Sequence, residues 1–542
     1  MARNLFLGCC LALLAGAGVA AGQVGSSVGA SVADAAMQKD ALRVRTLLAR
    51  KADVNAALGD GTTALHWAVY HHDADLVKVL LAAGADVKAK TRLGALTPVM
   101  MAARTGEAAV LAMLLAAKGD AVTANANGTT PLMFAAGAGE PEAVSMLIAR
   151  GADVNAADVT NGQTPLMFAA AQGRADAVKV LLAKKADPNA ATKVSPIISM
   201  GERYKAKTGG KGTREITSEG GRSDITAMGG LTALMFAARE GHIAVVGELV
   251  AGGANVNAVS GADDMSALTM AIVNGRLDIA MLLLDHGANP NLLSKNGSGP
   301  LWAVIDARWP ERTWYPPANI TQEKTTHLAL LRALLDRGAT PDVRITRKPW
   351  YRTFHGDWAN PVGATPLWLA SKANDVEAMR LLVAHGANPN IPSAAGVTPL
   401  QVAAGYGIEP QVTNFAPNAR LAAVRFLVEE VGADVNARDS QGYTPLHGAA
   451  LSANHDVILY LVSMGGDVTA RAGNIFGGEN QADKDAAAGT GDTVADMANG
   501  PRAHNMQFPE TVDLLVAMGS ANSDNCRYAT CVVRTLPSTA KK

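Results

Sequence analysis

Aromatic residues, cysteines and net charge are all scarce in this chain of 542 residues, and each shortage excludes something. Its 48 Lys and Arg residues balance 48 Asp and Glu residues, which argues against a nucleic-acid partner and against attraction to anionic lipid. Aromatic residues make up only 4%, whereas the 54 glycines exceed the usual share of about 7%, so we expect small, turn-rich packing units. Hydrophobic residues, at 49%, are too frequent for a chain that is disordered throughout.

Long hydrophobic runs are missing after the first residues of the chain. Arg3 precedes the apolar run from Leu5 to Leu14, and small residues follow as far as Ala21. This order is typical of a secretory signal peptide, so we predict that residues 1–21 are removed and that the protein is exported, to a periplasm or outside the cell. A membrane anchor is the alternative, but the run is shorter than the roughly 20 residues that span a bilayer. No later stretch is long enough, and we expect no stable membrane insertion after cleavage.

Cysteine and the usual catalytic motifs are nearly absent from the mature chain. Cleavage would leave only Cys526 and Cys531, and an even pair in an exported protein predicts a disulfide. The small ring it closes would stabilise the tail by only about 2 kcal/mol. No Gly-x-Ser-x-Gly or His-Glu-x-x-His motif occurs, and Lys211 lies in a Gly-rich stretch that lacks the spacing of a phosphate loop. We therefore predict no catalytic residue, no cofactor, no metal site and no enzymatic activity.

The feature that dominates the chain is an internal repeat. Thr-Pro-Leu, Thr-Ala-Leu or a close variant recurs mostly at intervals of 33 or 34 residues, and longer gaps contain an insert. Each such anchor is followed by a second apolar element that ends in a Gly-Ala-Asp or related turn. An early copy, Leu42 to Asn55, has the second element without the anchor, which brings the count to about twelve repeats. The anchors are Thr63, Thr97, Thr130, Thr164, Thr232, Ser266, Gly299, Thr365, Thr398, Thr444 and Thr493.

Each repeat is predicted to be a pair of helices. Thr130 is an N-cap before Pro131, which suits the first position of a helix, and Gly139 ends that helix. The second element has helical periodicity and stops at Gly151. One such pair cannot bury its own apolar face, so the pairs must stack on one another. We predict an all-α, elongated solenoid of stacked helix-turn-helix units.

The repeats resemble the ankyrin repeat family, in its exported bacterial form. The resemblance lies in Gly61 to His66, Gly128 to Leu132, Gly442 to His447 and the recurrent turns, and it extends over about residues 30–520. It implies an ankyrin-repeat solenoid with β-hairpin fingers and a concave face that binds protein partners, here as a monomer. The predicted segments are 1–21 signal peptide, 30–190 repeats 1–5, 191–230 finger insert, 231–306 repeats 6–8 (first part), 307–363 aromatic and basic inserts, 364–472 repeats 9–11, 473–491 Gly/Ala/Asp-rich insert, 492–520 capping repeat and 521–542 tail.

The resemblance also implies which positions contact a partner, namely the finger tips and the end of the first helix of each repeat. These positions are Thr62, Tyr70, His71, Arg104, Gln163, Gln172, Arg239, Glu240, Asn274, Lys372, Tyr406 and Tyr443.

The sequence departs from the family pattern at the His that follows Leu in each anchor. This His normally links neighbouring repeats. It is kept at His66 and His447 and replaced elsewhere by residues such as Met133, Trp302 and Trp368. We therefore expect the polar link to be missing, and the stack to be looser, at those repeats.

Inserts that most members of the family lack collect the aromatic residues. Six of the seven tryptophans lie between Trp302 and Trp368. Trp, Tyr and Arg dominate binding hot spots, so these inserts are candidates for binding an acidic protein surface or an anionic ligand. Two alternatives stay open: a Trp-lined pocket for a small molecule or glycan, as in a receptor or weak enzyme, and a structural plug in which the inserts clasp each other. The candidate residues are Trp309, Trp314, Tyr315, Arg344, Arg347, Lys348, Trp350, Tyr351, Arg352, Phe354 and Trp358.

Overall fold

The computed structural model describes residues 31–197, 227–310, 319–349, 359–408, 413–473, 491–499 and 508–522. Its contacts divide the chain into a first unit, residues 1–101 with 113–119, and a second unit, residues 102–112 with 120–542. Several predictions fall outside the described residues: the signal peptide, the Gly-rich stretch around Lys211, the disulfide between Cys526 and Cys531, and the insert residues Trp314, Tyr315, Trp350, Tyr351, Arg352, Phe354 and Trp358.

The first unit contains two complete helix pairs. The earliest copy, which has no Thr-Pro-Leu anchor, still begins with a helix, because Ser31 and Asp34 form a capping box there. Ser31 is thus the N-cap residue of this helix, in the position that Thr occupies in later repeats. Two further helices, α6 (Pro98–Thr105) and α7 (Ala108–Ala116), each contribute residues to both units. The pairs of the first unit are α2 (Val32–Met37) with α3 (Ala41–Ala49), and α4 (Ala64–Tyr70) with α5 (Ala74–Ala82).

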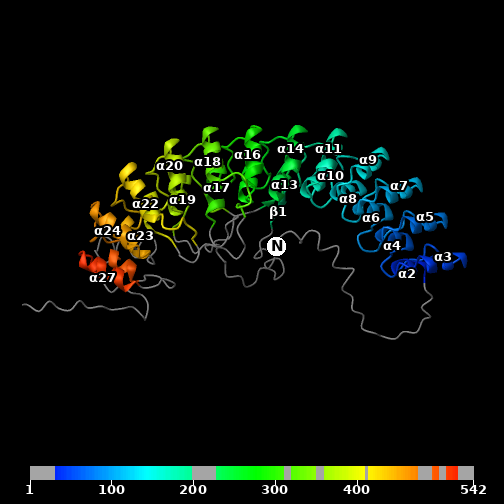
Figure 1. Ribbon diagram of the computed structural model, residues 1–542, viewed down its shortest axis with the longest axis horizontal. Coiled ribbons are helices and arrows are strands. Elements are labelled where there is room, and N and C mark those ends of the chain that lie inside the picture. The colour runs from blue at the N-terminus through cyan, green and yellow to red at the C-terminus, as the bar shows by residue number, and fades with distance from the viewer. Residues whose placement is uncertain are drawn as a thin grey trace, which may run out of the picture. The chain divides into compact units, whose positions relative to one another are not determined.

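The second unit is a single row of helix pairs. Each first helix contacts the first helix of the next pair, from α8 through to α26. Figure 1 shows the second helices along one edge of this row and the first helices along the other. The pairs are α8 (Pro131–Ala138) with α9 (Pro141–Ala149), α10 (Pro165–Ala171) with α11 (Ala175–Ala183), α13 (Ala233–Glu240) with α14 (Ile243–Ala251), α15 (Ala267–Val273) with α16 (Leu277–Asp285), α17 (Pro300–Arg308) with α18 (His327–Asp336), α19 (Pro366–Lys372) with α20 (Val376–Ala384), α21 (Pro399–Ala404) with α22 (Arg420–Arg425) and its π-helical continuation η2 (Phe426–Glu430), α23 (Pro445–Leu451) with α24 (His455–Ser463), and α26 (Val494–Ala498) with α27 (Pro509–Ala517).

The predicted start and stop of the repeat helices are confirmed in the fourth repeat. The hydroxyl of Thr130 accepts a hydrogen bond from the backbone N–H of Met133 at 3.3 Å, and Pro131 follows as the first helical residue. Gly139 ends the helix at φ 95°, a left-handed conformation that suits glycine. These local signals therefore mark where the first helix begins and ends.

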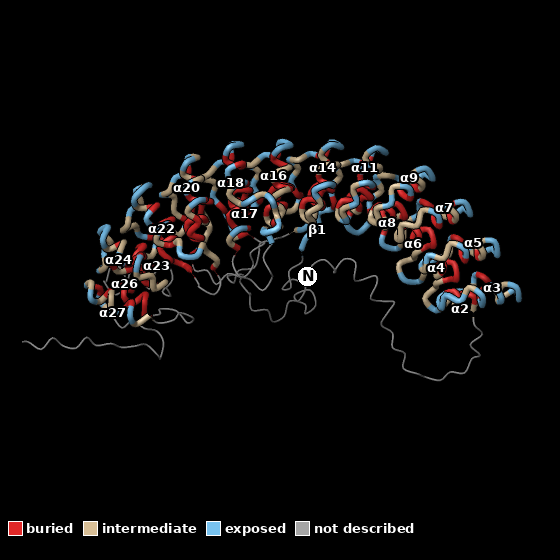
Figure 2. Tube along the Cα trace, viewed as in Figure 1, coloured by how far each residue is buried: buried red, intermediate tan, exposed pale blue. Residues whose placement is uncertain are grey.

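The core is a layer of small and branched side chains between the two rows of helices. Ala135 and Ala136 on the first helix and Val144 and Leu147 on the second are completely buried. Figure 2 shows the buried residues between the helices and the exposed residues on the turns and the second helices. The alanines let neighbouring first helices approach closely, so each repeat buries its apolar face against the next one.

Asparagine side chains in the turns connect successive repeats. Asn257 accepts a hydrogen bond from the backbone N–H of Asn289 at 2.7 Å and donates one to the carbonyl of Gly287 at 3.2 Å. The same pair of bonds recurs at Asn155, Asn189, Asn291 and Asn436. The recurrent turn residues are therefore explained by structure.

The fold class, an ankyrin-type solenoid that is mostly helical, is confirmed, but the fingers contain little regular strand. The one described sheet pairs β1 (Ser195–Pro196) with β2 (Ala227–Met228) in antiparallel register. Among the described residues, an isolated bridge between Ala191 and Thr232 extends this finger, and two further bridges, Val259 with Ser266 and Arg471 with Thr493, mark other fingers. Of the described helices, none has the length and hydrophobicity to cross a membrane.

The expected loss of the polar link between repeats is only partly correct. His66 Nε2 lies 3.1 Å from the carbonyl of Leu96 in the next finger. At the same position of later repeats, Trp368 Nε1 donates to the carbonyl of Val397 at 3.0 Å, and Gln401 Nε2 donates to the carbonyl of Tyr443 at 2.6 Å. Indole and amide N–H groups therefore replace the imidazole, and the link is restored there.

Candidate partner-binding surface

An aromatic cluster lies at the end of the first helix of repeat 2, in the first unit. The ring centroids of Trp67 and Tyr70 are 5.7 Å apart in an edge-to-face arrangement, and those of Trp67 and His71 are 5.7 Å apart with nearly parallel planes. Tyr70 also contacts His71 edge-on at 5.3 Å. Tyr70 is 39% exposed, so the cluster presents aromatic surface to solvent.

Local structure fixes the orientation of this cluster. Trp67 and Tyr70 are three residues apart on α4 and therefore share a helix face. The indole Nε1 of Trp67 donates to Thr62 Oγ1 at 3.2 Å, and His71 Nε2 lies 3.0 Å from the carbonyl of Met37 in the preceding repeat. His66 points the other way into the stack, where burial lowers its pKa. The described residues contain no group of three or more His, Cys, Asp or Glu that could hold a metal ion.

In the second unit, the predicted contact positions of repeats 3 to 7 lie at the surface. Arg104, Gln163 and Asn274 are partly exposed, and Gln172 is exposed. The side chains of Arg239 and Glu240 are 39% and 38% exposed and pair with each other at 2.9 Å. These repeats therefore present polar and charged groups at the ends of their first helices.

Three predicted contact residues of later repeats are buried, so they do not lie at the surface as the prediction required. Lys372, Tyr406 and Tyr443 are only 5%, 3% and 0% exposed. The hydroxyl of Tyr406 donates to the carboxylate of Asp439 at 2.7 Å, and the hydroxyl of Tyr443 donates to the carboxylate of Asp492 at 3.0 Å.

These tyrosines are core residues because each buried hydroxyl finds a buried acceptor in the next repeat. Burial raises the pKa of Asp439, and burial likewise raises the pKa of Tyr443. Neither shift indicates a catalytic group, because both side chains are enclosed by the stack.

Two of the four described insert residues, Trp309 and Arg344, make hydrogen bonds within the molecule. Trp309 donates from Nε1 to Asp375 Oδ2 at 2.7 Å, and the guanidinium of Arg308 lies 4.1 Å from the indole ring centroid. Arg344 donates to the carbonyls of Gly363 and Pro392 at 2.5 and 2.7 Å. Arg347 is exposed and Lys348 is partly exposed. For Trp309 this favours the structural plug over the open Trp-lined pocket.

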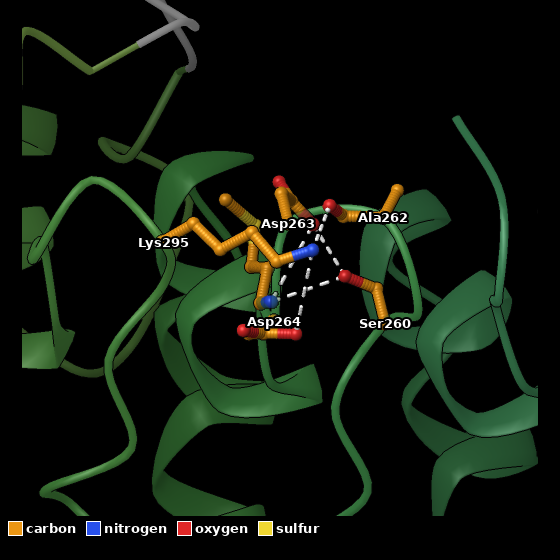
Figure 3. A network of polar contacts seen from close by, with 6 residues as sticks. Ser260, Ala262, Asp263, Asp264 and Lys295 are labelled. Carbon is orange, nitrogen blue, oxygen red and sulfur yellow. Dashed lines mark hydrogen bonds and ion pairs between the residues drawn. The ribbon is translucent and has the colours of Figure 1, made fainter. Parts of the chain in front are cut away.

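Finger tips are joined to one another by lysine side chains. Lys295 donates from Nζ to the carbonyl of Ala262 at 2.7 Å, and its ammonium lies 4.0 Å from Asp264 (Figure 3). Within the tip, Ser260 donates to Asp263 and accepts from the backbone N–H of Met265 at 3.0 Å. Lys193 likewise donates to the carbonyl of Val159 at 2.7 Å. Both lysines therefore stabilise neighbouring fingers.

Sequence reasoning missed Trp67, although a signal was present. Trp67 lies four residues after the anchor Thr63, and the same position holds Phe134, Phe168 and Phe236 in later repeats. The recurrence of an aromatic residue at this position of the repeat would have identified it.

Comparisons with known proteins agree with the observed architecture. Models described as ankyrin repeats match residues 6–91, 32–126, 99–192 and 212–294, and further ankyrin models match residues 362–394 and 413–462. The chain is 37% identical over 107 residues to alpha-latroinsectotoxin-Lt1a of Latrodectus tredecimguttatus, covering 20% of this chain and 7% of that protein. It is 39% identical over 92 residues to NF-kappa-B inhibitor delta of Mus musculus, covering 17% of this chain and 25% of that protein. The chain thus spans a quarter or less of the length of these relatives.

Among solved structures, the crystal structure of the human ASB11 ankyrin repeat domain matches with 24% identity and a TM-score of 0.37, covering 48% of this chain and 98% of that domain. The family models together match well over half of the sequence, and the described helix pairs, caps and turns repeat at the same period. The chain belongs to the ankyrin repeat family.

Proposed function

We propose that this protein is a non-enzymatic scaffold that binds a protein partner through the first-helix ends and finger tips of its early and middle repeats. The observation that carries the proposal is the partly exposed cluster of Trp67, Tyr70 and His71. Trp and Tyr dominate binding hot spots because they bury a large apolar area and retain a polar group. Ankyrin repeats generally mediate protein interactions, which supports the same role.

The proposal also covers the localisation, the oligomeric state and the class of partner of this protein. An exported, monomeric protein without a nucleic-acid partner fits the neutral charge and the apolar first residues. The absence of a cofactor and of catalysis is part of the same proposal.

The test is affinity capture with the full-length protein and its Tyr70→Ala variant. The side chain of Tyr70 contributes exposed aromatic surface, and the structure gives no hydrogen bond from its hydroxyl to another described residue, so the fold should persist. Loss of a hot-spot tyrosine costs about 2 kcal/mol or more, so the partner captured by the wild type should bind at least about thirtyfold more weakly.

Lys78→Ala is the matched control, because the Lys78 side chain is 64% exposed on the second helix of the same repeat. Equal loss of the partner in both variants, or a partner that binds Tyr70→Ala as tightly as the wild type, would exclude this surface as the binding site.

A further inference from the structure

The ends of the first helices differ sharply between the early and the late repeats of this chain. At the seventh and eighth positions after the anchor, Tyr70 is 39% exposed, and the side chains of Arg239 and Glu240 are 39% and 38% exposed. At the same positions of repeats 8, 9 and 10, Asp306, Lys372 and Tyr406 are only 8%, 5% and 3% exposed. Two of these are charged residues, which are rarely buried without a structural reason.

A segment of the chain itself lies over this region. Residues 413–419, which we call the strap, follow the first helix of repeat 10 and precede α22. The backbone N–H of Ala416 donates to the carbonyl of Ala373 at 2.8 Å, directly after α19 of repeat 9. The side chain of Asn414 donates from Nδ2 to the carbonyl of Pro310 at 2.6 Å, after α17 of repeat 8.

The strap therefore joins repeats that are not neighbours. Repeats in a solenoid normally contact only the preceding and following repeat, yet Asn414 and Pro310 are 104 residues apart and belong to repeats 10 and 8. In such an arrangement the strap must run across the first-helix end of repeat 9, where Lys372 is buried.

A buried carboxylate holds Trp309, the residue before the strap's contact at Pro310. Asp375, which is 6% exposed, accepts hydrogen bonds from Trp309 Nε1 at 2.7 Å and from the backbone N–H of Ala378 at 3.1 Å, and His327 Nε2 lies 3.0 Å from it. Burial alone would raise the pKa of Asp375, but the bonds from His327 and Trp309 outweigh it and lower the pKa. The carboxylate thus stays ionised and fixes Trp309 and Pro310 where Asn414 meets them.

Gly407, after the first helix of repeat 10, lies very close to Ala359 in the finger before repeat 9. Gly407 has φ 76°, and a Cβ atom there would lie 2.2 Å from the Cβ of Ala359, at the end of the finger insert. Only glycine permits this contact. The finger insert before repeat 9 therefore meets the turn after the first helix of repeat 10 at this point.

We propose that the strap is an intramolecular cover for the first-helix ends of repeats 8 to 10. A partner then reaches Asp306 and Lys372 only by displacing the strap. The closure stands on the geometry alone, whereas displacement by a partner rests on the proposed function. The binding surface of the resting molecule is then confined to the repeats before it.

The closure is tested without any partner, by amine labelling of the full-length protein followed by mass spectrometry. Lys179, with a side chain 55% exposed, is the internal reference. Lys372 in the wild type should react at least about tenfold more slowly than Lys179, because it becomes accessible only when the strap opens. In an Asn414→Ala/Ala416→Pro variant, which removes the hydrogen bonds to Pro310 and Ala373, the two rates should come within about threefold.

Pro417→Ala is the matched control, because Pro417 is an exposed strap residue and its change leaves both hydrogen bonds in place. Equal labelling of Lys372 and Lys179 in the wild type overturns the proposal, as does a Lys372 rate that the double variant leaves unchanged.

A second measurement needs no variant. In hydrogen exchange of the wild type, the amide of Ala416 should be protected by its hydrogen bond to the carbonyl of Ala373. Exchange at the rate of an unstructured amide would overturn the proposal that the strap is closed. If affinity capture finds no partner but amine labelling shows that Lys372 is protected, closure by the strap stands. The proposed function and the displacement of the strap by a partner then fail.

Discussion

Single buried histidines have consequences that can be measured. His447 is completely buried at the position that links repeats, and Thr444 contacts its Nδ1 at 2.9 Å. Burial lowers the pKa of His447 to about 3 from an ordinary value of 6.5. Between these two pKa values the unfolded chain therefore binds more protons than the folded chain. The stability that the neutral His447 contributes to the folded state is fully present above pH 6.5, and it falls as the pH drops toward 3.

His447→Gln should weaken this pH dependence, because glutamine does not titrate and Gln401 occupies the same position in the preceding repeat. Between pH 7 and pH 4.5 the wild type should lose roughly 2–3 kcal/mol more free energy of unfolding than the variant. Urea denaturation at both pH values measures the difference. An identical pH dependence in the two proteins would show that His447 accepts a proton without unfolding.

At the scale of elements, one inserted residue changes a helix type. In repeat 9 the N–H of Ala387 donates to the carbonyl of Leu382, five residues earlier. In repeat 10 the corresponding Ala433 donates to Leu427, six residues earlier, because the sequence carries an extra residue before the turn. The helix absorbs it as the π-helical segment η2. The repeat period alone did not reveal this, because the insert between Thr398 and Thr444 conceals a single added residue.

The link between a first helix and the next finger also belongs to this scale. Trp368→Phe keeps an aromatic ring but removes the N–H that bonds to the buried carbonyl of Val397. Leaving that carbonyl unpaired should lower the free energy of unfolding by about 1–3 kcal/mol. Chemical denaturation followed by circular dichroism measures it.

Trp302→Phe makes the same change at the same position of repeat 8, where the structure gives no hydrogen bond from the indole to another described residue. It is the control and should cost clearly less. Equal costs for Trp302→Phe and Trp368→Phe would mean that ring volume, and not the hydrogen bond, accounts for the effect.

For the whole molecule, stability depends on contacts between neighbouring repeats. Leu461 on α24 is completely buried, and Leu461→Ala should destabilise its repeat by about 2–5 kcal/mol. Since repeats transmit stability mainly to their neighbours, hydrogen exchange should speed up in α23 to α27 and stay unchanged in α4. Leu459→Ala, on the same helix but 48% exposed, is the control and should change little. Faster exchange in α4 would show that the chain unfolds as one cooperative block.

The sequence by itself determined the repeat unit. The Thr cap, the Pro that follows it and the terminal Gly act within a few residues, so helix starts such as Thr130 and ends such as Gly139 could be predicted from local chemistry. The same holds for Tyr70, which family position placed correctly at the surface. Local signals suffice wherever each partner of an interaction lies within one repeat or the next.

Only the tertiary structure decided which predicted contact residues are available to a partner. Lys372 and Tyr406 occupy positions equivalent to exposed residues of earlier repeats, but the tertiary structure buries them. Asn414 reaches Pro310 across a whole intervening repeat, a contact that no periodicity encodes. Burial depends on what covers a residue, and here the covering chain comes from far away in the sequence.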